Sequence, residues 1–291
     1  MRLVPRTRDV SLAIGSAAHE TLYHWYRQRR AAMDRIAARH QVQLFGEAEG
    51  TKDWRDQEEH DKLVYGATAF KAMMLGYART YANDRHQWSY KRDQVEIEFQ
   101  IDLGEFLFQG KIDLYARQGT TPFLVEHKTA KTITGSYIER LAMDTQTRSY
   151  IYGATKGQHL PVKEVLYDII RKPSLRRKSN ESLDDFTERL SDDYCARPSF
   201  YFYREGLKYS KDDIESFEYE MRQTHKEYQA IIDGEYGPPD DPRTWGPNDS
   251  TCNDFFRLCP YFHICTQGLE RGNGSTFTQL EIMHAELGES S

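Results

Sequence analysis

The sequence is poor in cysteine, in long apolar runs and in positive charge. Four cysteines among 291 residues are too few for a disulfide-stapled scaffold. No apolar run approaches the ~20 residues of a membrane span, and the N-terminus lacks the apolar segment of a secretory signal. We therefore expect a cytoplasmic protein with no membrane partner. The net charge of −6 argues against coating of nucleic acid by bulk positive charge, but it leaves room for a local basic groove.

A β-hairpin predicted over residues 110–128 carries the most informative polar side chains. Asp113 lies in its first strand, on the face opposite the aliphatic residues on either side. Glu126 and Lys128 are two residues apart in the second strand and share a face, while His127 points the other way. In-register pairing would bring the two carboxylates and the ammonium group together. Buried charges need partners, and a divalent cation held by the two carboxylates would supply one.

Helices and further strands are predicted on both sides of this hairpin. Apolar residues recur at three-to-four spacing in the helical segments and alternate in the strands. The polar segment 41–56 is interpreted as a loop. Glu96 and Glu98 are assigned to a solvated strand face, with the alternative that one of them approaches the cation. The predicted elements are helices over 11–40, 58–83 and 138–156, and strands over 95–103 and 162–170, the last parallel to the second hairpin strand after a helical crossover.

Four sequence features follow one another along the chain: Gly15-x-x-x-His19, Asp113, Glu126-x-Lys128 and Gln146-x-x-x-Tyr150. In type and order they resemble the motifs of the RecB-like branch of the PD-(D/E)xK nuclease superfamily, and the resemblance covers about residues 11–170. The chain is most similar to phage-type exonucleases and to CRISPR-associated iron-sulfur nucleases.

The resemblance implies a metal-dependent nuclease that hydrolyses DNA phosphodiester bonds. Asp113 and Glu126 would hold Mg²⁺ or Mn²⁺, with His19 as a further ligand and the backbone carbonyl of His127 joining them. Such an ion lowers the pKa of a bound water and neutralises charge on the scissile phosphate.

The remaining motif residues would act on the substrate and the attacking water. The resemblance implies that Lys128 orients the water or stabilises the transition state as a point charge. Gln146 and Tyr150 lie one helical turn apart and would position the DNA strand or brace Lys128.

The resemblance also implies an α/β fold with a restriction-endonuclease-like core, in which a central mixed sheet is flanked by helices. We expect a single nuclease domain over residues 1–291. Its parts are N-terminal helices (1–90), the catalytic core (91–172), a mainly helical insertion (173–250) and a cysteine-cluster tail (251–291).

Three of the four cysteines fall close together near the C-terminus. Cys252, Cys259 and Cys265 resemble the C-terminal triplet that, in iron-sulfur nucleases of this superfamily, shares a [4Fe-4S] cluster with an upstream cysteine. That fourth cysteine is missing. Either the chain as given starts late, or Cys195 substitutes, or the cluster is absent. Zinc bound by the three thiolates and His263 is one alternative, and three small apolar residues without a ligand are another.

Several functions are compatible with these features. An exonuclease acting on DNA ends in recombination, repair or phage DNA processing is favoured, and a structure-specific endonuclease is the near alternative. A non-catalytic DNA-binding factor on a nuclease scaffold is disfavoured by the intact charged triplet, and an iron-sulfur redox protein by the missing fourth cysteine. DNA is the expected partner, with a homo-oligomer or a recombination protein as further candidates. A phage-encoded protein would act in the host cytoplasm.

Overall fold

The computed structural model describes residues 3–5, 10–28, 30–50, 57–81, 88–238, 241, 244, 252, 258–259, 261–267 and 277–279. The chain divides into two compact units. The larger comprises residues 9–214, and the smaller comprises residues 1–8 together with residues 215–291. None of the helices within the described ranges is long and apolar enough to cross a membrane.

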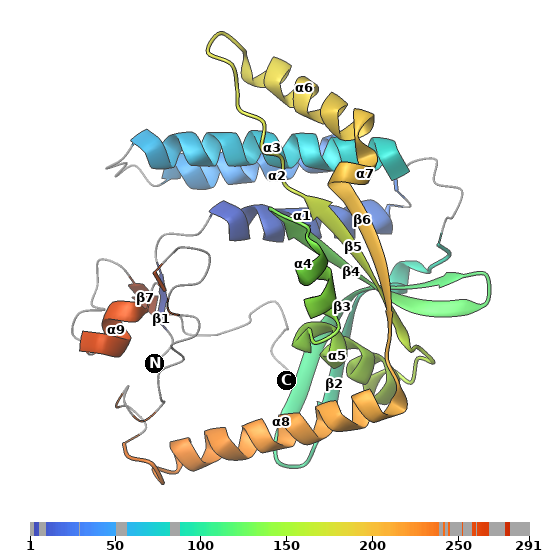
Figure 1. Cartoon of the computed structure of the whole chain (residues 1–291), viewed down its shortest axis with the longest axis vertical. Coiled ribbons are helices and arrows are strands. Elements are labelled where there is room, and N and C mark those ends of the chain that lie inside the picture. Colours follow the sequence, from blue (N-terminus) through green and yellow to red (C-terminus); the bar gives the residue numbers. More distant parts are fainter. Residues whose placement is uncertain are drawn as a thin grey trace. The chain divides into compact units, whose positions relative to one another are not determined.

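A five-stranded mixed sheet forms the centre of the larger unit (Figure 1). The first three strands make an antiparallel meander, the third and fourth are parallel, and the fifth is antiparallel to the fourth. The predicted hairpin and the parallel strand after a crossover are confirmed. In spatial order the strands are β2 (Val95–Asp102), β3 (Leu107–Gln118), β4 (Thr121–Ala130), β5 (Glu164–Arg171) and β6 (Phe202–Lys208).

Three long helices form a layer on one face of this sheet (Figure 1, blue to cyan). They are α1 (Val10–Arg27), α2 (Met33–Gly50) and α3 (Gln57–Tyr81). Apolar side chains of these helices and of the sheet make the larger core. Its members include Leu22, Trp25, Met33, Phe70, Met73 and Tyr77 from the helices, and Leu114, Val125 and Ile170 from the strands.

The boundaries of these helices correct two predictions. The single helix expected over 11–40 is broken, because Arg30 and Ala32 have left-handed φ angles of 62° and 59° that cannot continue a helix. The loop expected over 41–56 is wrong up to Gly50, where α2 ends. The break escapes detection because the apolar spacing continues on either side of it.

The other face of the sheet is covered by α4 (Gly135–Leu141), α5 (Thr145–Tyr152) and a π-helical turn (Gly153–Gly157). They divide the helix predicted over 138–156, because Asp144 accepts a hydrogen bond from the N–H of Gln146 and starts α5 as its N-cap. Their core includes Ile151 and Ala154 from the helices, and Phe99, Ile112, Tyr115, Leu124, Val165 and Ile169 from the strands. The expected α/β fold, a central mixed sheet flanked by helices, is confirmed.

The remaining elements lie outside the sheet and its two helical layers. In the larger unit, η1 (Arg92–Gln94) precedes β2, α6 (Leu183–Ala196) packs on α3, and α7 (Pro198–Tyr201) leads into β6. Helix α8 (Lys211–Ile232) begins in the larger unit and continues into the smaller one. Within the smaller unit, α9 spans Phe262–Gln267, and β1 (Leu3–Pro5) pairs antiparallel with β7 (Phe277–Gln279).

Candidate active site

Midway along strands β2 and β3, the side chains that should share one face of the sheet point to opposite faces. On β2, Val95 packs into the core under α1, whereas Ile97 packs into the core under α5. On β3, Leu114 likewise packs into the core under α1, and Ile112 packs into the core under α5. Glu96 lies between the two halves of β2 with a left-handed φ of 56°, which interrupts the alternation of side chains although the register with β3 is unchanged. The expectation that Ile112 and Leu114 share one face is therefore wrong.

The carboxylate of Asp113 lies where the side chains of β3 switch faces, and it is held there by two contacts. Its Oδ2 lies 3.3 Å from Nδ1 of His19 and accepts a hydrogen bond of 2.9 Å from the backbone N–H of His127. Burial acts to raise the pKa of Asp113, but the imidazole of His19 outweighs burial and holds that pKa below its usual value. The pKa of His19 is raised to about 9, since Asp113 outweighs the opposite effect of burial. The structure therefore brings His19 and Asp113 together as a charged pair.

Helix α1 positions His19 over strand β4. Gly15, one turn earlier, faces Thr129, and a Cβ built on Gly15 would lie 3.6 Å from Oγ1 of Thr129. That separation is ordinary van der Waals contact, so within this chain an alanine would fit at the first position of the Gly-x-x-x-His motif.

Glu96 lies closer to the site than its assignment to a solvated strand face implied. Its side chain is 20% exposed, and its Oε2 lies 3.2 Å from Nζ of Lys111. Burial and the neighbouring Asp113 raise the pKa of Glu96. The assignment is wrong because alternation cannot reveal the left-handed backbone at this position.

Glu126 is the most deeply buried acid of the group, at 0% exposure. Nζ of Lys128 lies 3.0 Å from its Oε1 but without hydrogen-bond geometry, and neither carboxylate oxygen has a hydrogen-bond partner among the described residues. Burial, followed by the charge of Asp113, raises the pKa of Glu126 to about 8. A buried carboxylate with orphaned oxygens beside a second carboxylate is a site that a divalent cation fits.

Lys128 connects this acid to helix α5. Besides Glu126, its Nζ lies 3.4 Å from Oδ2 of Asp144 and donates to Oε1 of Gln146. Gln146 in turn donates from Nε2 to the hydroxyl of Tyr150 at 2.7 Å. Burial would lower the pKa of Lys128, but Glu126 and Asp144 raise it, so the ammonium form persists. The sequence analysis did not predict a role for Asp144. Its position two residues before Gln146, where an aspartate is typical of a helix N-cap, could have indicated it.

The side chain of His127 points to the opposite face, into a buried polar network. Its Nδ1 lies 3.2 Å from Oδ2 of Asp168, which is 0% exposed, and its ring stacks on Tyr26 with centroids 5.3 Å apart. Tyr77 donates to the same carboxylate oxygen. Nε of Arg204 lies 3.0 Å from the other oxygen of Asp168.

Aromatic rings shield the cation of this network. The guanidinium carbon of Arg204 lies 3.7 Å from the ring centroid of Tyr81 and 4.4 Å from that of Trp88. Burial acts to raise the pKa of Asp168, but Arg204 and His127 outweigh it and hold that pKa well below the usual range. Neither Asp168 nor Arg204 was predicted; the signal was Asp168 as the one charged residue in the run 165–170.

The cysteines are described only in part. The N–H of Cys259 donates to the carbonyl of Cys252 at 2.8 Å, and Cys265 lies on α9. Cys195 is exposed on α6 in the other unit. Within the described residues, no three cysteines form a group with all sulfurs within 4.8 Å. The side chain of His263 lies outside the described residues.

Comparison with known proteins agrees with this geometry. A family model described as the PD-(D/E)XK nuclease superfamily matches residues 1–266. No curated protein matches the chain. A model covering most of the chain, together with a mixed sheet that carries an Asp and a Glu-x-Lys on adjacent strands, places this protein in the PD-(D/E)XK nuclease superfamily with its restriction-endonuclease-like fold.

Proposed function

We propose that this protein is a deoxyribonuclease of the RecB-like branch, which hydrolyses phosphodiester bonds with Mg²⁺ or Mn²⁺. The observation that carries the proposal is Glu126, a fully buried carboxylate beside Asp113 whose oxygens have no hydrogen-bond partner among the described residues. Its ion-pair partner Lys128 lies 3.0 Å away, yet burial and the charge of Asp113 still raise the pKa of Glu126, and a bound divalent cation would offset both effects. A scaffold that only bound DNA would have no use for that arrangement.

The ligands would be Asp113, Glu126 and His19, with the carbonyl of His127 completing the set. The imidazole of His19 would release its proton when the ion binds, because only the neutral ring can be a ligand. When bound there, the metal ion supplies an activated water and neutralises charge on the phosphate. The contact between His19 and Asp113 at 3.3 Å supports their joint role. The backbone N–H of His127 fixes the orientation of the Asp113 carboxylate.

Lys128 would stabilise charge on the reacting oxygens, and neighbouring side chains would hold it in position. Lys128 keeps its proton and presents a fixed positive charge, which suits stabilisation of charge developing on the phosphate. Gln146 holds Nζ of Lys128 from one side and donates to Tyr150 from the other, so the ammonium has little rotational freedom. Asp144 adds a second anchor for the same ammonium.

Within nucleases, we favour an exonuclease that acts on DNA ends in recombination, repair or phage DNA processing. This preference rests on the order and type of the motifs. A structure-specific endonuclease is the alternative. A circular substrate separates the two, because only an endonuclease cuts it.

The test is a digest of end-labelled linear and circular DNA across a series of divalent metals. We expect cleavage of linear DNA that needs Mg²⁺ or Mn²⁺ and stops with chelator. Asp113→Asn and Lys128→Met should each lower the rate by at least about 100-fold. Lys208→Met, which removes an exposed lysine at the far edge of the sheet, is the matched control and should cleave normally. Equal rates for Asp113→Asn, Lys128→Met and the parent would refute the assignment.

We also propose that Cys252, Cys259 and Cys265 contribute thiolates to a [4Fe-4S] cluster, for which the smaller unit offers no fourth cysteine. The backbone hydrogen bond between Cys259 and Cys252 supports their proximity. Protein purified without oxygen should show a broad visible absorption that Cys259→Ser reduces. A colourless protein with no bound iron would end this proposal.

A further inference from the structure

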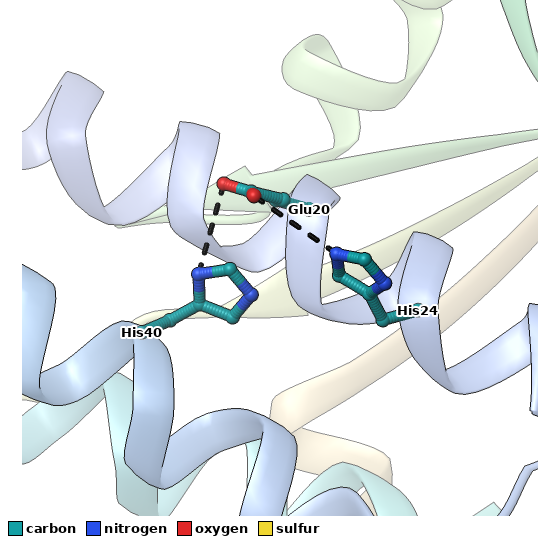
Figure 2. A group of neighbouring side chains, drawn as sticks. All are labelled: Glu20, His24 and His40. Carbon is teal, nitrogen blue, oxygen red and sulfur yellow. Dashed lines mark ion pairs between the residues drawn. The ribbon is translucent and has the colours of Figure 1, made fainter.

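Two helices of the larger unit bring together two histidines and a glutamate outside the nuclease site. Glu20 and His24 lie one turn apart on α1, and His40 lies on α2 (Figure 2). Oε2 of Glu20 is 3.6 Å from Nδ1 of His40, and Oε1 is 4.0 Å from Nε2 of His24. One ligand atom from each residue lies within 4.8 Å of both others. Among the described residues, this is the one group of three such side chains that meets that condition.

We propose that Glu20, His24 and His40 bind a divalent metal of the zinc class and thereby clamp helix α1 to helix α2. The inference is independent of the proposed nuclease function. Two imidazoles and one carboxylate form a ligand set that zinc sites use, with water in the fourth position. The nuclease site is richer in carboxylate oxygen and takes Mg²⁺ or Mn²⁺, so the two sites differ in metal preference.

The spacing of the three side chains suits a metal better than it suits direct contact. At 3.6 and 4.0 Å the pairs are too far apart for hydrogen bonds. Two ligand atoms bound to one zinc at about 2.0–2.1 Å in tetrahedral geometry lie roughly 3.4 Å apart. Small movements of the exposed Glu20 and the partly exposed His24 would therefore complete the site.

The burial of His40 anchors the group. His40 is 3% exposed, whereas Glu20 and His24 have side chains that are 53% and 35% exposed. Figure 2 shows the imidazole of His40 directed from α2 toward Glu20 on α1. The ring of His40 also stacks on that of His24, with centroids 5.9 Å apart and planes 25° apart. One ligand is therefore preorganised by packing, and the other two reach it from the solvent side.

The clamp would act across the break between helices α1 and α2. Between α1 and α2 the backbone passes through two left-handed residues, Arg30 and Ala32. A metal held from both helices adds a cross-link over this break, and metal that binds only the folded state stabilises it. Since His19 precedes Glu20 on α1, the clamp would also hold the helix that carries the nuclease histidine.

The test uses the full chain with Asp113→Asn, so that the nuclease site does not dominate metal binding. Chelator-treated protein is titrated with Zn²⁺ against a chromogenic chelator. It is then titrated with Co²⁺, whose visible bands distinguish imidazole and carboxylate ligands from thiolates. Glu20→Gln and His24→Ala change exposed side chains, so both should keep the fold by circular dichroism. His225→Ala on α8 is the matched control, and the four cysteines are common to every protein compared.

We expect the parent and His225→Ala to bind a Zn²⁺ equivalent that Glu20→Gln and His24→Ala bind at least tenfold more weakly. Zn²⁺ should raise the melting temperature of the parent by more than it raises that of these two variants. A change in affinity smaller than tenfold, or Co²⁺ bands of thiolate type alone, would overturn the proposal.

Discussion

The backbone N–H of His127 donates a hydrogen bond of 2.9 Å to Oδ2 of Asp113. The pairing of β3 with β4 begins at Leu114, so this bond links the two strands one residue before their ladder starts. The same oxygen lies 3.3 Å from His19. One carboxylate thus joins both hairpin strands to helix α1, and the predictions below follow from this connection.

Glu126 should make the metal-free protein less stable as the pH rises. Its pKa is raised from 4.5 to about 8 in the folded state, so the folded protein binds this proton more tightly than the unfolded chain does. The stability contributed by the protonated form is complete below pH 4.5 and is lost as the pH rises to about 8. Urea unfolding in chelator across this range measures the effect.

Glu126→Gln is the control for this titration. The neutral amide should remove the decline assigned to Glu126 and raise the stability of chelated protein at pH 8 by on the order of 1 kcal/mol or more. Mn²⁺ should stabilise the parent at pH 8 and stabilise this variant much less. A parent and a variant with the same pH dependence would contradict the assigned burial of the charge.

Asp168→Ala should be strongly destabilising. It leaves the partly buried guanidinium of Arg204 without its carboxylate and removes the partner of the buried His127, and breaking a buried ion pair from one side costs about 3–5 kcal/mol. The double variant Asp168→Ala/Arg204→Met should recover part of the loss, because it leaves no unpaired charge. Denaturant unfolding of the parent, of Asp168→Ala and Arg204→Met alone, and of the double variant closes the cycle, and strict additivity would argue against a coupled pair.

Tyr150→Phe should slow the reaction while DNA binding remains. It removes the hydroxyl that accepts the hydrogen bond from Gln146, and Gln146 then restrains Lys128 less. We expect kcat to fall by about tenfold with KM nearly unchanged, since the interaction serves the transition state. Tyr219→Phe, at an exposed position on α8, is the matched control. A rise in KM at constant kcat would show that Tyr150 binds the ground state.

Gly76→Ala should destabilise the protein although it lies inside helix α3. Alanine is normally better than glycine in a helix by about 1 kcal/mol. Here a Cβ would collide with the Cβ of Tyr194 on α6, and overpacking of this kind costs about 1–3 kcal/mol. Gly135→Ala at the start of α4 meets no atom within 4 Å and serves as the control. Thermal melting of both variants gives the comparison.

Part of the site could be predicted because its residues lie at fixed spacing within single elements. Glu126 and Lys128 share a face through the two-residue period of a strand, and Gln146 and Tyr150 share one through the helical turn. The place of Glu96 was predicted wrongly because it depends on a left-handed backbone conformation at a single residue. Asp168 was missed because it meets its partners through the pairing between strands. Neither relation has a short-range signature in the chain.

The sequence by itself determined the hairpin, the crossover to a parallel strand and the family, because each depends on local periodicity and on motifs read in order. Only the tertiary structure decided where the first helix breaks and that Glu96 lies near Asp113. It also decided that the side chain of His127 contacts Asp168, which in turn pairs with Arg204. The reason is physical: backbone conformation at single residues and contacts between distant segments are set by the packing of the whole sheet and its helices. Local propensity cannot encode them.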